Sequence, residues 1–265
     1  MTRSAFMKAC LLGALGLLAK GLMTGPAVGQ SVETKLLVRA VSHDAKIIGT
    51  NVGGVEITIR DVETGIVLAS GTHLGSTGST ELIMTKPRER GGTVFDTEGA
   101  GGFLSTLEIS EPTLVEVTAE GPLGTPQAVQ RTSTTLWMVP GRDVLGEGLV
   151  LVLNGFAIRL ESPMPEGAFP AGEPIGVRAH VEMLCGCPIT PGGMWDSDRL
   201  EILARLLSGS EIVAETALGY GGERSKFEGA LMAPSPGKYR LEILAIDPER
   251  ANFGRAEQRL YVTGS

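Results

Sequence analysis

The sequence IGVRAHVEML, residues 175–184, alternates between apolar and polar side chains. Successive side chains of a β-strand point to opposite faces of the sheet, so this alternation predicts a strand with one face in a core and one in water. The inward-facing residues would be Val177, Ala179, Val181 and Met183. The outward-facing residues would be Arg178, His180 and Glu182. The run therefore favours a β-protein over a helical one.

Comparable apolar runs, separated by turns, occur on both sides of this segment. They lie at residues 36–40, 55–60, 66–69, 113–119, 158–160, 239–245 and 260–262. Of the 265 residues, 37 are glycine, roughly twice the usual share of ~7%, which favours many turns. With 42% apolar residues the chain can bury substantial cores, which excludes disorder for most of its length. We expect an all-β fold.

The segment 196–207 fits two structures. Asp196 suits a helix N-cap, and leucines follow it at helical spacing. The segment also alternates as a strand would, with Leu200, Ile202, Ala204 and Leu206 on one face. A sandwich needs a further strand at this point in the chain, so we favour the strand.

The first 29 residues have the pattern of a secretory signal peptide. Arg3 and Lys8 provide a basic start, residues 9–19 form an apolar run, and small residues precede a cleavage site near Gly29. Lys20 interrupts the run short of the ~20 apolar residues that a membrane-spanning helix needs. We expect cleavage of residues 1–29 and a mature protein that is periplasmic or secreted, without a membrane span.

The mature chain would be acidic. Removing Arg3, Lys8 and Lys20 lowers Lys+Arg from 23 to 20 against 30 Asp+Glu, so the net charge changes from −7 to −10. Such a surface repels phosphate backbones, and no basic stripe with interleaved aromatic residues occurs, so we exclude nucleic acid as a partner. The common motifs of nucleophilic, metalloprotease and nucleotide-dependent catalysis are missing from the sequence. We therefore expect a protein that is not an enzyme.

Two stretches resemble known β-sandwich families. The run GVEITI at residues 54–59, followed by Asp61, Thr64-Gly65 and small residues up to Gly71-Thr72, resembles the opening hairpin of carboxypeptidase-regulatory-like domains. That resemblance implies a transthyretin-like sandwich of seven strands. We assign residues 31–154 to this first domain.

The second stretch lies near the end of the chain. Ser235-Pro236-Gly237-Lys238 leads into a strand that begins with Tyr239, and a last strand ends at Tyr261-Val262. This order resembles the last two strands of bacterial immunoglobulin-like sandwiches, and it implies a structural tyrosine whose hydroxyl bonds to the backbone. We assign residues 155–265 to this second domain.

Cys185 and Cys187 are the only cysteines left once Cys10 is removed with the signal peptide. Exported compartments favour disulfides. In an extended strand, however, the two Cα atoms would lie ~6.5–7 Å apart, at the limit of the usual 4.4–6.8 Å range for a disulfide. Gly186 and Pro188 would have to bend the chain for the bond to form.

Two other interpretations of the cysteine pair remain open. Thiolates and thioethers select Cu(I), so the loop could hold copper, the only cofactor that the sequence suggests. The donors would be Cys185, Cys187, Met183, Met194 and His180. Alternatively, the pair could exchange disulfides with another exported protein. Trp195 would pack near the sulfurs or form a binding spot.

We therefore predict an exported, non-enzymatic accessory or binding protein. In this hypothesis the loop 183–196 binds a partner protein or a soft metal ion such as Cu(I). One alternative is a thiol–disulfide redox partner. The other is a structural cell-surface or adhesion module in which the cysteine loop only braces a bend.

Overall fold

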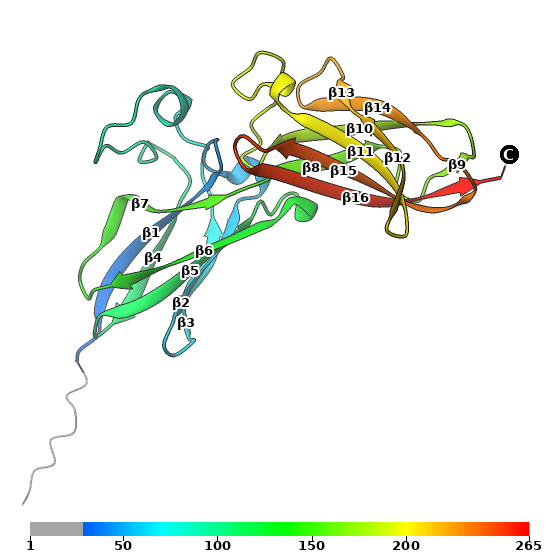
Figure 1. The fold of residues 1–265 in the computed structure, drawn as a ribbon. Coiled ribbons are helices and arrows are strands. Elements are labelled where there is room, and N and C mark those ends of the chain that lie inside the picture. Colours follow the sequence, from blue (N-terminus) through cyan, green and yellow to red (C-terminus); the bar gives the residue numbers. More distant parts are fainter. Residues whose placement is uncertain (1–28, 265) are drawn as a thin grey trace, which may run out of the picture.

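The computed structural model describes residues 29–264, which are almost entirely β-strands and connecting loops. The predicted signal peptide, apart from Gly29, lies outside the described residues. Strands β1–β7 form two sheets and strands β8–β16 form two others, and no sheet mixes the two sets. Figure 1 shows the two units end to end, with a bend where they meet. The all-β fold is thus confirmed.

The first unit contains seven strands in two sheets, the number that the transthyretin-like resemblance implies. These are β1 (Val32–Ser42), β2 (Val55–Asp61), β3 (Val67–His73), β4 (Phe103–Ile109), β5 (Thr113–Gly121), β6 (Gln130–Met138) and β7 (Val144–Leu153). One sheet has the order β4-β1-β7 and the other β3-β2-β5-β6. The pair β1–β7 is parallel, whereas the other pairs of neighbours are antiparallel.

The second unit has the strand order of an immunoglobulin-like sandwich. Its strands are β8 (Phe156–Ser162), β9 (Ala168–Pro170), β10 (Pro174–Met183), β11 (Glu201–Ser208), β12 (Glu211–Ala217), β13 (Gly219–Tyr220), β14 (Lys226–Met232), β15 (Gly237–Asp247) and β16 (Asn252–Thr263). One sheet is β13-β14-β10-β8 and the other β12-β11-β15-β16-β9. The first sheet matches strands D, E, B and A of that fold, and β11, β15 and β16 match C, F and G.

The ambiguous segment 196–207 is a strand, as favoured. β11 covers most of it and pairs with β15 over seven residues. Asp196 is also an N-cap, as its position suggested. Its side chain accepts a hydrogen bond from the Asp198 N–H at the start of a single 3-10 turn, η4 (Ser197–Arg199). The turn ends at once, since the following residues bury one face against the core.

Tyr239 forms the corner that the resemblance implies. Its hydroxyl donates to the Ser235 carbonyl oxygen at 2.8 Å, and its ring is buried at the start of β15. The bond joins the strand to the turn before it, so this tyrosine is structural.

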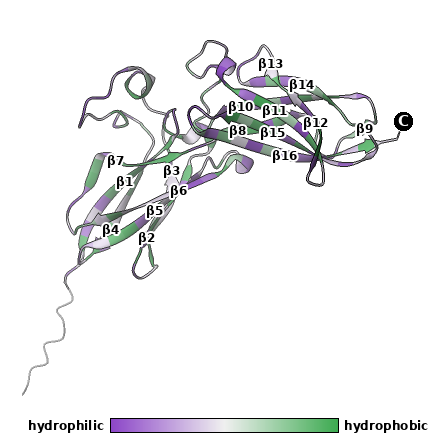
Figure 2. Cartoon of the chain, viewed as in Figure 1, coloured by the Kyte–Doolittle hydropathy of each residue, from purple (hydrophilic) through white to green (hydrophobic). Residues whose placement is uncertain are grey.

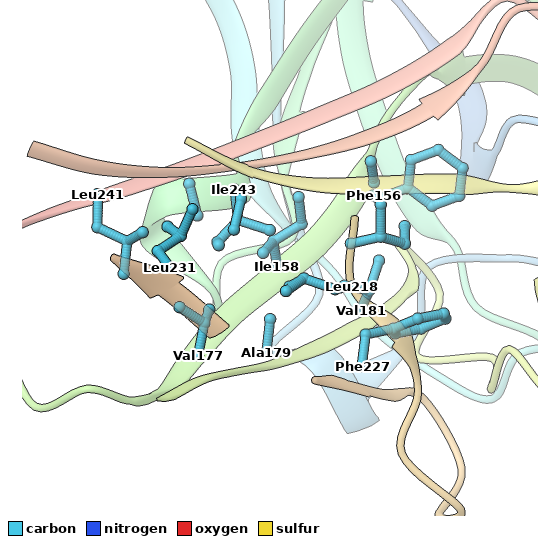
Figure 3. Close-up of a cluster of buried hydrophobic side chains, with 14 of the residues drawn as sticks. Phe156, Ile158, Val177, Ala179, Val181, Leu218, Phe227, Leu231, Leu241 and Ile243 are labelled. Carbon is cyan, nitrogen blue, oxygen red and sulfur yellow. The ribbon is translucent and has the colours of Figure 1, made fainter. Parts of the chain in front are cut away.

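Alternation builds the core of the second unit. Figure 3 shows the inward side chains of β10, among them Val177, Ala179 and Val181, facing those of β15, Leu241 and Ile243. All five are buried, as predicted for β10. Hydrophobic and hydrophilic residues are accordingly mixed along the strands in Figure 2.

The long connection between β3 and β4 is not a simple loop. It contains a π-helical turn, η2 (Glu81–Thr85), and residues Ile83 and Phe95 join a small third core with Ile47. Buried Arg39 anchors the last part of this connection, because it donates to the Gly101 carbonyl at 2.7 Å and pairs with Asp96 at 3.1 Å. None of the helices within residues 29–264 has the length and apolar character needed to cross a membrane.

Candidate functional site

The segment Cys185-Gly186-Cys187 forms a tight turn at the end of β10. The Gly186 N–H donates to the Met183 carbonyl at 2.8 Å, and the Met183 N–H to the Cys187 carbonyl at 3.1 Å. Gly186 has a φ of 74°, a conformation that favours glycine. This bend brings the two cysteine Cα atoms to 5.4 Å, within the usual disulfide range, and the structure joins their sulfurs.

The cysteine turn docks on the first unit, where it meets the 3-10 turn η1 (Thr50–Val52). The Asn51 side-chain amide donates to the Cys185 carbonyl at 2.9 Å. A Cβ atom on Gly186 would lie only 2.8 Å from Val52 Cγ1, so glycine is needed for this close approach. Leu184, between these contacts, is fully buried in the core of the first unit.

The exchange of core residues is reciprocal. Leu184 and Ala157 of the second unit belong to the first core, whereas Ala45 of the first unit belongs to the second core. Cys185 and Cys187 follow Leu184 in the chain but lie in the second core. Because each core contains residues of the other unit, the two sandwiches share one apolar junction.

Polar contacts surround this junction. The turn after β1 meets the β15–β16 hairpin, where His43 Nε2 lies 2.7 Å from the Arg250 carbonyl oxygen and Arg250 pairs with Asp44 at 2.9 Å. The Trp195 indole N–H donates to the Asp44 carbonyl at 2.9 Å. Asp44 has a φ of 49°, which is unusual outside glycine and marks a turn held by its surroundings.

A pocket of about 310 Å³ opens at the junction. Phe156 and Met183 are buried lining residues, while Met194 is 49% exposed. The charged lining residues are Asp44, Asp196, Arg199, Asp247 and Arg250. Asp44 comes from the first unit and the others from the second, so the shape of the pocket depends on the junction.

Most of the charges in this pocket are already satisfied. Arg250 pairs with Asp44 and with Asp247, the latter at 3.2 Å. The Gly192 and Asp198 N–H groups donate to the Asp196 carboxylate and lower its pKa. Arg199 is exposed and forms no ion pair within residues 29–264. The Arg199 charge also helps to lower the pKa of Asp196, so the pocket offers two buried apolar side chains, Phe156 and Met183, and one guanidinium outside these ion pairs.

The loop over the pocket is fixed by its own hydrogen bonds. The Thr190 N–H donates to the Trp195 carbonyl at 3.0 Å, and the Ser197 N–H to the Thr190 carbonyl at 3.2 Å. Trp195 packs against the second core and leaves Met194 at the exposed tip. A ligand would therefore meet a preformed surface, which lowers the entropy cost of binding.

The predicted metal donors have different surroundings in the structure, although Met183 and Met194 line the same pocket. The sulfurs of Cys185 and Cys187 bond to each other, and a disulfide offers no thiolate to a soft metal. Met183 is buried, Met194 is exposed, and His180 lies on the outer face of β10, 3.2 Å from Glu182 Oε2. Among the described residues no three His, Cys, Asp or Glu side chains are grouped as metal ligands.

Half of the residues that line the pocket lie outside the predicted binding loop 183–196. Asp44, Asp247 and Arg250 lie up to 206 positions apart in the chain, so no local pattern links them. Arg199 was inside the segment analysed but carried no signal beyond its charge. The predicted loop supplies the other half, including Trp195 and the two methionines that were predicted individually.

Comparisons with known proteins identify no family. No family model matches the chain, and no curated protein matches it. A similar solved structure is an engineered protein, with 17% identity over 44% of this chain and a TM-score of 0.31, of which the chain covers 22%.

Two further structures are similar over most of both chains. The fibronectin(III)-like modules of Clostridium thermocellum CbhA have 11% identity, cover 88% of this chain and 95% of theirs, and give a TM-score of 0.28. Domains 4 and 5 of the S-layer protein SbsC have 9% identity, cover 88% and 99%, and give 0.29. At such TM-scores neither likeness carries an argument, so the fold rests on the strand pairings above.

Proposed function

We propose that this protein is an exported, non-enzymatic structural and binding module. Its two sandwiches are fixed at one angle, and the junction pocket receives a segment of another exported protein. The observation that carries this proposal is the reciprocal exchange of Leu184 and Ala45 between the two cores. A flexible tether would have left both residues in water.

The chemistry of the pocket suggests what it binds. An apolar side chain of the partner would contact Phe156 and Met183, and a neighbouring carboxylate would meet Arg199. The volume of about 310 Å³ lies at the lower end of the ~300–1,000 Å³ range of typical ligand sites, and the lining combines buried apolar side chains with five charged ones. In this proposal the cysteine turn braces the junction, as in the structural alternative.

The same proposal includes export of the protein and the family of its first unit. The signal-peptide pattern of residues 1–29 supports export to the periplasm or the medium. The seven strands of the first unit, together with the hairpin at residues 54–72, support a carboxypeptidase-regulatory-like domain.

Residual dipolar couplings of backbone amides test the fixed angle. We expect one alignment tensor to fit the strands of both units in the wild-type protein. In Gly186→Ala the added Cβ would approach Asn51 and Val52 to 2.7–2.8 Å, so the two units should give different tensors. Gly172→Ala is the matched control, because its φ of 82° imposes similar backbone strain but its Cβ would meet no atom within 4 Å. Two tensors in the wild-type protein would refute the proposal.

Photocrosslinking in the source cells tests the binding role. Benzoylphenylalanine at position 194 should give an adduct with one exported protein, and Arg199→Glu should abolish that adduct. The same label at Ile212, which is 48% exposed on β12, controls for random collision. Equal labelling from both positions would contradict a binding role for the pocket.

A further inference from the structure

A second cavity lies on the outer face of the sheet β12-β11-β15-β16-β9. It encloses about 320 Å³, and its lining includes Leu207, Lys238, Arg240, Arg259 and Tyr261. Arg240 lies directly opposite Arg259 on the neighbouring strand, and Lys238 lies opposite Tyr261. On these two strands Tyr239, Leu241, Leu260 and Val262 are buried in the core, so alternation directs Lys238, Arg240, Arg259 and Tyr261 outward. We call these five residues the basic groove.

The basic groove contains three cations and no carboxylate among its lining residues. Glu257 Oε2 lies 3.3 Å from Arg240 Nε, but the same oxygen also accepts from Arg255 at 2.6 Å. Arg240 Nε is buried and makes no hydrogen bond despite this proximity. Across the described part of the chain, Lys238 and Arg259 form no ion pair.

This charge arrangement is unfavourable in the free protein. Like charges directly opposite each other destabilise an antiparallel pair, and Arg240 faces Arg259 in this way. The chain as a whole has 30 acidic and 23 basic residues, so counter-charges are not scarce. At the groove, however, the nearest counter-charge of Arg240 is Glu257, which it shares with Arg255, whereas Arg205 on the same sheet pairs with Glu215 at 2.6 Å.

We propose that the basic groove binds an oxyanion, a carboxylate, sulfate or phosphate group, carried by a ligand with a ring or apolar body. Side chains opposite each other on antiparallel strands have Cβ atoms ~4.5–5.5 Å apart, so both guanidinium groups can contact one anionic group. Guanidinium binds such groups through two parallel hydrogen bonds. Leu207 and the Tyr261 ring, with the Lys238 ammonium 6.0 Å from its centroid, would contact the rest of the ligand.

Titration of the isotope-labelled mature protein with sulfate, phosphate and glucuronate tests this site, with sodium chloride keeping the ionic strength constant. We expect saturable shifts of amides at 238–240 and 259–261. Arg259→Gln should weaken binding at least about tenfold, because it removes one charged donor pair. Arg205→Gln, on the same face but outside the groove, should bind as the wild type does.

Stability supplies an independent readout. Without added anion, Arg259→Gln should be at least as stable as the wild type, since it removes a like-charge contact. Shifts that sodium chloride reproduces, or equal losses in Arg205→Gln and Arg259→Gln, would overturn the proposal. Comparing glucuronate with polyglucuronate distinguishes the source of the anion: tighter binding of the polymer indicates a polysaccharide, and equal binding per residue a free anion. The result is independent of the junction pocket.

Discussion

Replacing Leu184 by alanine should destabilise the first sandwich, although Leu184 is part of the second unit in the chain. The side chain is fully buried in the first core, although the residue lies in the second unit. The substitution removes three carbon groups, each contributing about 0.8 kcal/mol of transfer free energy, and leaves a cavity. Together these terms amount to about 3–4 kcal/mol, within the range measured for buried leucines. That is a large part of the 5–15 kcal/mol typical of a whole protein.

Native-state hydrogen exchange measures this effect strand by strand. In Leu184→Ala, amides of β1, β2 and β5 should lose protection, because their inward residues share the core with Leu184. Leu206→Ala is the matched control, since Leu206 is equally buried but lies wholly within the second core. It should lower protection mainly in β10, β11 and β15.

The two variants together allow a refutation. If Leu184→Ala lowers protection only in the second unit, the first core does not depend on this side chain. If it costs less than about 1 kcal/mol in urea unfolding, Leu184 is not buried as described. Either result would remove the basis for a shared junction.

Three further predictions concern other parts of the molecule. Burial lowers the pKa of His73 to about 4, so the unfolded chain binds the proton more tightly. The free energy of unfolding should therefore be greatest above the unfolded pKa of about 6.5 and fall by about 2 kcal/mol between about pH 7.5 and pH 5, as measured by urea unfolding. His73→Phe should flatten this slope. A wild-type protein whose stability does not change with pH would contradict the prediction. Tyr239→Phe should lower the free energy of unfolding by about 1 kcal/mol in urea unfolding, because it removes the hydrogen bond to Ser235. The same change at the more exposed Tyr261 should have almost no effect, and equal losses would argue against the tyrosine corner. Mass spectrometry of the exported protein should show a chain that begins near Gln30, and an intact Met1 would remove the signal peptide from the proposal.

The strands were predictable because their signal is local. Alternation at 175–184 correctly placed Val177, Ala179, Val181 and Met183 in the core, and the tyrosine corner followed from the residues around Tyr239. Each of these signals depends on neighbours within about ten positions, the distance over which backbone geometry determines side-chain direction. The all-β fold could therefore be predicted without tertiary information.

The junction could not be predicted in the same way. Alternation places Leu184 on the opposite face from Met183, but nothing in the sequence shows that the core of another unit covers that face. The contact of Gly186 with Asn51 joins positions 135 apart, and a single sequence contains no pattern at that separation. The Cys-x-Cys pair predicted a disulfide, a soft-metal site or a redox couple, and the structure has the disulfide; the docking of this turn on the first unit had no local signal.

The location of the disulfide also limits what its sulfurs can do. Cys185 is fully buried and Cys187 is 5% exposed, so a reductant or Cu(I) can reach them only after the turn opens, and we expect that opening to break the contacts of the turn with the first unit. That movement withdraws Leu184 from its core. With the cost of about 3–4 kcal/mol derived above, only about one molecule in several hundred would be open at a time. Leu184→Ala should therefore speed reduction of the disulfide by a similar factor, whereas Leu206→Ala should not. Equal rates in the wild type and Leu184→Ala would mean that the sulfurs are accessible without opening the junction, and the redox and Cu(I) interpretations would then regain their force.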